Sequence, residues 1–298
     1  MPAESGTIET VALLGAGGTM GKGMARNLAG AGIAVRAWNR TLAKLDELRG
    51  EPGFTVCETP AEAAGGADAL VTMLTDGDAV LAAMEGEQGA VAGAEEGTIW
   101  LQTSTIGIEA TERCKALAGA SDLVLVDAPV LGTKQPAEAG ELVILASGPA
   151  SVRGPLAPLL DAIGKKTIWA GEEAGAGSRL KLVTNAWLVT VVEGTAEMVA
   201  LSRALGIEPD LALEAFEGGP LDSPYMRVKA REMLAGEFEP SFRLALAAKD
   251  AGLAVDAAEA AGLELPALEA IAERFAAAAR EHGDEDLAAV YLATESTS

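Results

Sequence analysis

With 298 residues, 49% of them hydrophobic, the chain is long enough for two globular domains with their own cores. Its formal net charge of −22 argues against nucleic acids and acidic membrane surfaces as partners, and no uninterrupted apolar run reaches the ~18 residues of a membrane span. The N-terminus lacks the basic region and apolar core of a secretory signal, and Cys57 and Cys114 form neither a disulfide framework nor a metal-ligand cluster, so we expect a cytoplasmic protein.

The first segment with a clear pattern, Val11–Arg40, reads as a strand, a glycine-rich turn, a helix and a second strand. Gly15, Gly17 and Gly18 follow the first apolar run at once, and a helical pattern opens at Thr19. This order is the βαβ unit that binds a dinucleotide. The glycines let the backbone approach a pyrophosphate closely, and the N–H groups at the start of the helix bind its negative charge.

The spacing of the glycines departs from the usual dinucleotide-binding fingerprint. Gly15, Gly17 and Gly21 form G-x-G-x-x-x-G, which is one residue longer than G-x-G-x-x-G. An ordinary tight turn between a strand and a helix is the simpler alternative. The dinucleotide interpretation is favoured because both strands and the helix fall where the motif needs them.

Strand-like and helical segments alternate through the first half of the chain, which predicts a mainly parallel sheet covered on both faces. Asp76 is expected to cap the helix that follows it, and we expect a loop over 128–141. The strands that we expect are 11–14, 33–38, 55–56, 69–74, 98–102, 123–126, 142–146 and 167–169, and the further helices are 41–48, 60–65, 79–85, 108–118 and 152–163.

After Gly171 the pattern becomes helical. Ala176–Leu205 contains no proline and no strand-like alternation, so we expect one long helix, and its apolar residues cover more of its circumference than one core face needs. We therefore expect a homodimer or larger homo-oligomer through this region. Further helices are expected at 209–216, 223–234, 241–262, 266–282 and 284–292. The predicted fold class is α/β, with a Rossmann-like, doubly wound domain over residues 1–170 and an all-α domain over residues 171–298.

Few residues are available for proton transfer. The only histidine, His282, lies among charged residues, where solvation is its expected state, so neither a histidine acid/base nor a histidine metal site is expected. Lysine, aspartate, glutamate or tyrosine remains. Lys181 is flanked by apolar residues and Asn185 follows it by one helical turn, so both side chains could enter one cleft. From this spacing alone, a solvated lysine on an amphipathic helix is the simpler interpretation.

Four motifs in order resemble those of the β-hydroxyacid dehydrogenase family, which includes 3-hydroxyisobutyrate dehydrogenases and glyoxylate/succinic semialdehyde reductases and binds NAD(P) as 6-phosphogluconate dehydrogenase does. The resemblance runs from Val11 to about Tyr291. The motifs are GAGGTMGKGMARNLAGAG in the glycine-rich turn, DAPVLGTKQPAEAGEL, GSRLKLVTN at Gly177–Asn185 and FRLALAAKD at Phe242–Asp250. The resemblance implies an NAD(P)-dependent oxidoreductase without a metal, which interconverts a small aldehyde or keto acid and the corresponding hydroxy acid.

The resemblance also implies roles for single residues. Lys181 would hand a proton to the carbonyl oxygen as general acid/base, and Asn185 would orient that oxygen. The implied substrate-binding positions are Ser104, Gly132 and Thr133. The implied cofactor-binding positions are Gly15, Ala16, Gly17, Gly18, Thr19, Met20, Asn39, Arg40, Thr41, Leu74, Thr75, Thr105 and Lys249.

The end of the second strand bears on the choice of cofactor. It reads Asn39–Arg40–Thr41, without the acidic residue that grips the ribose 2′-hydroxyl of NAD. An arginine there accommodates a 2′-phosphate, so NADP(H) is favoured over NAD(H). A solvated arginine at the start of the next helix is the simpler alternative.

The substrate remains open at this level. The loop KQPAEAGEL looks more like the glyoxylate/succinic semialdehyde reductase branch, but Leu131 stands where most members of the family carry serine, which removes a hydroxyl donor. An imine reductase of the same fold, or a non-enzymatic dinucleotide-dependent oligomerisation module, are alternative functions. Lys181 counts against the imine reductase, and intact Lys181 and Asn185 count against the oligomerisation module. The substrate is expected to be a small anionic carbonyl or hydroxy acid.

Overall fold

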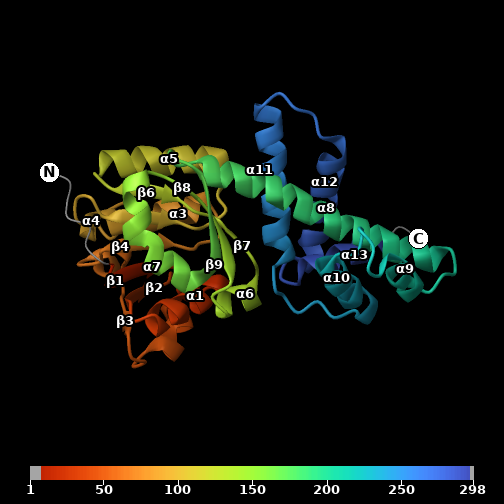
Figure 1. The fold of residues 1–298 in the computed structure, drawn as a ribbon, viewed down its shortest axis with the longest axis horizontal. Coiled ribbons are helices and arrows are strands. Elements are labelled where there is room, and N and C mark those ends of the chain that lie inside the picture. Colours follow the sequence, from red (N-terminus) through yellow and green to blue (C-terminus); the bar gives the residue numbers. More distant parts are fainter. Residues whose placement is uncertain (1–7, 296–298) are drawn as a thin grey trace. The chain divides into compact units, whose positions relative to one another are not determined.

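The computed structural model describes residues 8–295. These fall into two compact units that divide between Lys181 and Leu182, the first α/β and the second helical. The predicted fold class is confirmed: a mostly parallel sheet of Rossmann type is followed by a helical region (Figure 1). The domain boundary at 170/171 stays a prediction, and the long helix α8 (Ala176–Ala204) runs through the division between the units.

The strands of the first unit form one sheet in the order β3-β2-β1-β4-β5-β6-β8-β7, with β9 paired to β8. β1 to β6 run parallel, whereas β8 is antiparallel to β6 and β7. The carboxyl ends of β1 to β6 therefore meet at one edge, which is where such sheets bind ligands. The strands are β1 (Thr10–Leu14), β2 (Ala34–Trp38), β3 (Phe54–Val56), β4 (Ala69–Thr72), β5 (Ile99–Gln102), β6 (Val124–Asp127), β7 (Val130–Leu131), β8 (Leu142–Ser147) and β9 (Gly164–Gly171).

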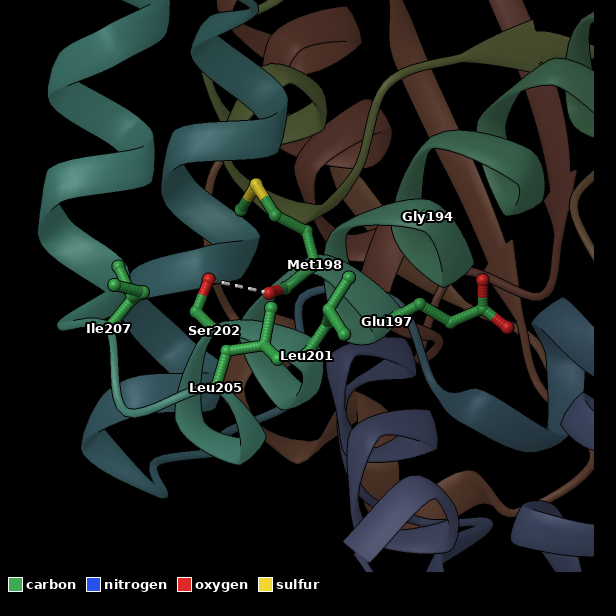
Figure 2. Close-up of a pocket in the computed structure, with 7 residues that line it drawn as sticks. All are labelled: Gly194, Glu197, Met198, Leu201, Ser202, Leu205 and Ile207. Carbon is green, nitrogen blue, oxygen red and sulfur yellow. Dashed lines mark hydrogen bonds between the residues drawn. The ribbon is translucent and has the colours of Figure 1, made fainter.

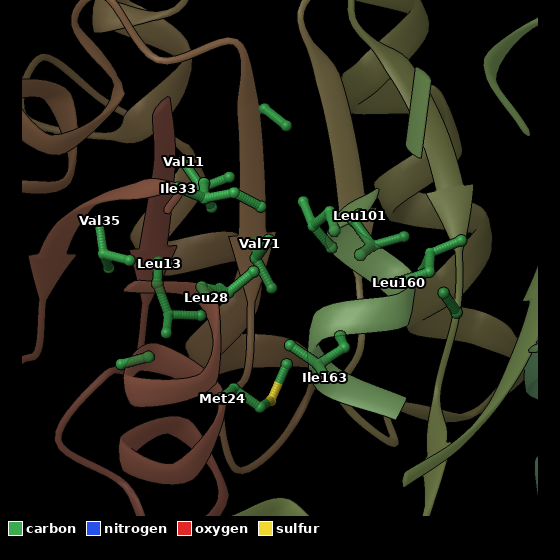
Figure 3. Close-up of a cluster of buried hydrophobic side chains, with 14 of the residues drawn as sticks. Val11, Leu13, Met24, Leu28, Ile33, Val35, Val71, Leu101, Leu160 and Ile163 are labelled. Atoms are coloured by element: carbon green, nitrogen blue, oxygen red, sulfur yellow. The ribbon is translucent and has the colours of Figure 1, made fainter. Parts of the chain in front are cut away.

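Both faces of the sheet are covered, as the alternation of strands and helices predicts. Val11 and Leu13 of β1 are buried in one core cluster, and Ala12 and Leu14 in another, because successive side chains of a strand point to opposite faces. Figure 3 shows the first cluster. It is covered by α1 (Thr19–Gly30), η1 (Leu42–Leu48), α6 (Lys134–Glu138) and α7 (Arg153–Ile163), and the second by α2 (Pro60–Ala64), α3 (Gly77–Met84), α4 (Ala90–Gly93) and α5 (Gly107–Ala120).

Several predicted elements need correction. The helix expected at 41–48 is a 3-10 helix, closed by bonds such as that from the Lys44 N–H to the Thr41 carbonyl. The strand expected to continue to Leu74 ends at Thr72, because the Leu74 N–H donates to the Ser104 side chain instead of to a strand. The loop expected over 128–141 contains β7 and α6, β9 is longer than the predicted 167–169, and α4 and η2 (Ala150–Val152) were not predicted.

The second unit holds most of α8 and a set of shorter helices, several of which begin with proline at a position where the missing N–H costs nothing. No helix of the described residues is long and apolar enough to cross a membrane. The helix expected at 284–292 is instead η3 followed by α13. The helices are α9 (Pro209–Phe216), α10 (Pro224–Ala235), α11 (Leu244–Ala260), α12 (Pro266–His282), η3 (Leu287–Ala289) and α13 (Val290–Glu295).

A buried ion pair ties the second unit together. Lys229 of α10 lies 2.6 Å from Asp286, and their side chains are 1% and 0% exposed. Asp286 also accepts hydrogen bonds from the Ser241, Phe242 and Ala288 N–H groups. Burial acts to raise the pKa of Asp286, but the hydrogen bonds from Lys229 and the Ala288 N–H outweigh it and hold the pKa below its usual range.

Removing the lysine should leave a buried carboxylate without its cation. We expect Lys229→Met to lower the free energy of unfolding by about 3–5 kcal/mol, whereas Lys115→Met, which breaks an exposed pair with Glu112, should cost about 1 kcal/mol or less. Because its pKa is depressed, Asp286 contributes stability that is present above the usual carboxyl pKa and is lost as the pH falls through the folded value. Urea unfolding measures both variants, and equal losses would contradict the account.

Candidate active site

The glycine-rich turn at the carboxyl end of β1 is built on backbone contacts that exclude side chains. Gly15 has a φ of 101°, and a Cβ there would overlap the carbonyl oxygen of Met73. A Cβ at Gly21 would overlap the carbonyl oxygen of Gly15, so the third glycine lets α1 pack directly on the turn. The extra residue of the motif is therefore absorbed within the turn, where the Gly18 N–H donates to the Gly15 carbonyl at 2.9 Å.

The N-terminus of α1 has the properties of an anion site. Its N-cap, Gly18, makes no side-chain cap, and its first turn contains no acidic residue. The N–H groups at a helix start bind negative charge, and the helix dipole favours it. A Cβ at Gly17 would lie 2.7 Å from the Lys44 Cβ, so this glycine also keeps the cradle open. The residues present therefore fit the pyrophosphate of a dinucleotide.

Two cations lie just beyond the end of β2. Arg40 and Lys44 are both exposed, and among the described residues neither takes part in an ion pair. The Asn39 side chain donates to the Thr41 carbonyl at 3.0 Å, which fixes the turn between β2 and η1. The sequence analysis missed Lys44, although its place four residues after Arg40 in a helical segment was the available signal.

Side chains brace the loops that follow β4 and β5, where Leu74, Thr75 and Thr105 were predicted to bind the cofactor. The Ser104 hydroxyl, which is buried, accepts from the Leu74 N–H at 2.8 Å. The Gln102 side chain accepts from the Ser104 N–H at 2.7 Å and donates to the Ser104 carbonyl at 2.8 Å. Ser104 and Gln102 thus fix both loops, and contact of Ser104 with a substrate stays a prediction.

The segment predicted to hold the substrate carboxylate is fixed against α1. Gly132 has a φ of 127°, which favours glycine, and Thr133 is half-buried at the start of α6. A Cβ at Gly23 of α1 would lie 2.6 Å from the Ala137 carbonyl, and the Asn27 side chain donates to that carbonyl at 2.7 Å. The structure therefore places this segment beside the helix that begins at the glycine-rich turn.

Lys181 lies near the N-terminus of α8 and is 7% exposed, so it is not the solvated lysine of the simpler interpretation. Asn185 follows on the same face of this helix, one turn later. Among the described residues, no group of three or more histidine, cysteine, aspartate or glutamate side chains is arranged to hold a metal ion.

In the second unit, Asn185 is bonded to an aspartate that the sequence analysis did not single out. Its Nδ2 donates to the Asp250 carboxylate at 2.7 Å, and the Lys249 Nζ lies 2.8 Å from the other oxygen of that carboxylate. A carboxylate only accepts, so the amide nitrogen must face Asp250. The Asn185 Oδ1 is left as a buried acceptor without a hydrogen-bond partner among the described residues. The sequence feature that could have identified Asp250 was its position next to Lys249.

Comparisons with known proteins cover both units. Residues 10–171 match the NAD-binding domain of 6-phosphogluconate dehydrogenase, and residues 175–293 match the NAD-binding domain of NADP-dependent 3-hydroxyisobutyrate dehydrogenase. The chain is 32% identical over 289 residues to the chloroplastic glyoxylate/succinic semialdehyde reductase 2 of Arabidopsis thaliana, covering 96% of this chain and 79% of that protein. It is 31% identical to 3-sulfolactaldehyde reductase of Escherichia coli (strain K12), covering 92% of each.

A solved structure is similar along its whole length. The 3-hydroxyisobutyrate dehydrogenase of Mycobacterium tuberculosis, solved with L-serine, superposes with a TM-score of 0.85 at 28% identity. The match covers 97% of this chain and 99% of that chain.

Proposed function

We propose a reaction for this chain on the premise that it belongs to the β-hydroxyacid dehydrogenase family. It is an oxidoreductase with a nicotinamide dinucleotide cofactor. We propose that it uses NADP(H) to interconvert a small aldehyde or keto acid and the corresponding hydroxy acid. The substrates after which two similar enzymes are named support this, because succinic semialdehyde, glyoxylate and sulfolactaldehyde are all small carbonyl compounds with an anionic group.

The observation that carries the proposal is the burial of Lys181 near the start of α8, in the motif where the family's catalytic lysine is expected. When bound, the nicotinamide supplies or takes the hydride. The protein must then move one proton at the substrate oxygen. The Lys181 ammonium stabilises the negative charge that grows on this oxygen during reduction and gives it a proton, and the neutral amine takes the proton back during oxidation.

The hydrogen bond of Asn185 to Asp250 determines which atom the amide offers to a ligand. Because Nδ2 faces the carboxylate, the buried Oδ1 is the atom that lacks a partner among the described residues. An amide oxygen accepts, so it pairs with the hydroxyl of a hydroxy acid rather than with a carbonyl oxygen. We therefore propose that Asn185 orients the alcohol form of the substrate.

Replacing the lysine tests the proposed chemistry. We expect Lys181→Ala to lower kcat by on the order of 10²-fold or more, with the NADPH Kd within about threefold, because the glycine-rich turn is untouched. The assay is NADPH oxidation against succinic semialdehyde, glyoxylate, 3-sulfolactaldehyde and a cyclic imine. Arg179→Ala, an exposed change on the same helix, is the matched control and should keep activity. A Lys181→Ala protein with most of its activity would overturn the role, and turnover of the imine alone would indicate an imine reductase.

The preference for NADP(H) rests on charge at the end of β2. No acidic residue stands there, and Arg40 and Lys44 are exposed without ion pairs among the described residues. Arginine binds phosphate through two parallel hydrogen bonds, whereas lysine acts as a point charge. We propose that both hold the 2′-phosphate, with Arg40 contributing more.

Titrations with both cofactors test this preference. Arg40→Ala should raise the NADPH Kd by roughly 10- to 100-fold, which corresponds to about 1.5–3 kcal/mol for a hydrogen bond to a charged group, and should leave the NADH Kd unchanged. Lys44→Ala should act in the same direction but less. Lys166→Ala, an exposed change on β9, should alter neither value. Equal NADPH affinity of the wild type and Arg40→Ala would end the proposal.

One side of α8 is apolar and exposed, and we propose that a second copy of this chain covers it. Val183, Trp187, Leu201 and Leu205 are between 59% and 69% exposed and recur at the spacing of one helix face. The same face borders a pocket (Figure 2), lined by Gly194, Glu197, Met198, Leu201, Ser202, Leu205 and Ile207. Exposed large apolar side chains that share one helix face in this way mark an interaction site.

A charge placed on this face should weaken assembly. We expect the wild type to be a homodimer or larger at micromolar concentration, and Trp187→Asp to shift it toward the monomer in light scattering coupled to size exclusion. Leu263→Asp changes a leucine of similar exposure in the loop between α11 and α12, so it should leave the mass unchanged. A monomeric wild type would contradict the proposal.

The cysteines support a reducing, cytoplasmic location. Cys57 and Cys114 are both free and buried. Burial raises the pKa of both thiols, that of Cys114 to about 12, so the reactive thiolate form is rare at neutral pH. Neither is suited to a disulfide or to redox chemistry in this fold.

A further inference from the structure

We infer that Asp127 is a positioning residue that fixes Lys181 through the first turn of α8. Asp127 is the last residue of β6, at the carboxyl edge of the sheet, and is 1% exposed. Asp127, its hydrogen-bond partners and Lys181 all belong to the first unit. The inference rests on the proposed role of Lys181 in proton transfer and adds the residue that holds this lysine in place.

Both oxygens of the Asp127 carboxylate accept hydrogen bonds from the start of α8. The N–H groups of Gly175 and Ser178 donate to Oδ2 at 3.0 and 2.7 Å, and the Ser178 hydroxyl donates to Oδ1 at 2.6 Å. The Ser147 hydroxyl of β8 adds a longer bond of 3.2 Å to Oδ2. The carboxylate thus binds the backbone N–H groups of Gly175 and Ser178, and the side chain of Ser178 as well.

No cation accompanies this carboxylate: among the described residues, no ion pair includes Asp127. Burial raises its pKa, and the hydrogen bonds from Ser178, Gly175 and Ser147 oppose the shift without cancelling it. The N-terminus of a helix stabilises negative charge through its free N–H groups. The N–H groups at the start of α8 therefore stabilise the ionised form of Asp127, and the Asp127 carboxylate in turn holds the start of α8 in place.

The same turn of α8 is pressed against the sheet. A Cβ at Gly177 would overlap the Leu145 carbonyl oxygen and lie 2.8 Å from the Asp127 carbonyl oxygen, so only glycine allows this approach. The Gly177 N–H donates to the Ser147 hydroxyl at 2.9 Å, and the Thr111 hydroxyl of α5 lies 3.1 Å from that of Ser178. The first turn of α8 is therefore fixed to β6, β8 and α5.

Lys181 follows Ser178 by three residues, so the two lie on neighbouring positions of one helix face. The position of the lysine therefore follows the position of the turn that Asp127 holds. A displacement of about 1 Å at a catalytic group can cost on the order of 10²-fold in rate. Loss of the carboxylate should consequently weaken the proton transfer more than it weakens cofactor binding, because no hydrogen bond among the described residues joins the glycine-rich turn at β1 to this network.

The experiment compares Asp127→Ala, Asp127→Asn and Ser178→Ala with the wild type, in NADPH oxidation with succinic semialdehyde. We expect Asp127→Ala to lower kcat by about 10- to 100-fold, with the NADPH Kd within about threefold. The solvent isotope effect on kcat in D2O should rise, because proton transfer becomes more rate-limiting. Asp127→Asn should lose less, since its amide oxygen still accepts from the two N–H groups. Ser178→Ala removes the hydroxyl bonds to Asp127 and Thr111 but keeps the N–H bond to Asp127, and it should shift both quantities in the same direction.

Asp68→Ala is the matched control. The Asp68 carboxylate also accepts from two backbone N–H groups, those of Glu9 and Thr10 at 2.9 and 2.8 Å, but at the opposite edge of the same sheet. It should lower stability without changing kcat or the isotope effect. If Asp127→Ala does not fold, the kcat values and solvent isotope effects of Asp127→Asn and Ser178→Ala test the inference instead.

The outcomes separate the inference from the function on which it rests. Folded Asp127 and Ser178 variants with wild-type kcat and isotope effect would overturn the inference and leave the proposed function standing. A Lys181→Ala protein that retains activity would overturn both.

Discussion

At three glycines, backbone packs on backbone so closely that no side chain would fit between them. These contacts hold the carboxyl edge of the sheet together. Gly21 brings α1 onto the glycine-rich turn, Gly23 brings the same helix onto Ala137, and Gly177 brings α8 onto β8. These contacts join the anion site, the segment predicted to bind substrate and the turn before Lys181 to one rigid sheet. Dispersion and backbone packing at this distance tolerate little displacement, and a side chain at any of these positions would separate the elements.

The distribution of charge also favours an anionic ligand at this edge of the sheet. The chain is strongly acidic, with a formal net charge of −22, yet the cations beside the glycine-rich turn, Arg40 and Lys44, are not neutralised by carboxylates of the described residues. Nearby, by contrast, Lys22 and Arg26 both pair with Glu47. Two neighbouring cations without ion-pair partners among the described residues can attract an anionic cofactor in spite of the overall negative charge of the chain. Exposed charges act over only about 10 Å at moderate ionic strength, so the more distant carboxylates are largely screened.

Much of the fold could be predicted from the sequence because its signals are local. The alternation of apolar strands and helices, the long helix after Ala176 and the Asp76 cap, which accepts from the Ala79 N–H at 2.8 Å, all follow from neighbouring residues. The fold class and the family are confirmed. The hydrogen bonds between Gln102 and Ser104 and between Asn185 and Asp250, and the contact of Asn27 with Ala137 across 110 residues, depend on tertiary neighbours that no periodicity reveals.

The central claim is that this chain transfers a hydride from NADPH to the carbonyl carbon of a small anionic aldehyde or keto acid. The most direct measurement uses NADPH that carries deuterium at both C4 positions, with succinic semialdehyde, and follows the product by mass spectrometry. The account predicts a hydroxy acid that carries one deuterium at the former carbonyl carbon. Deuterium that never reaches the product, on this substrate or on any other semialdehyde or keto acid of the panel, would contradict it.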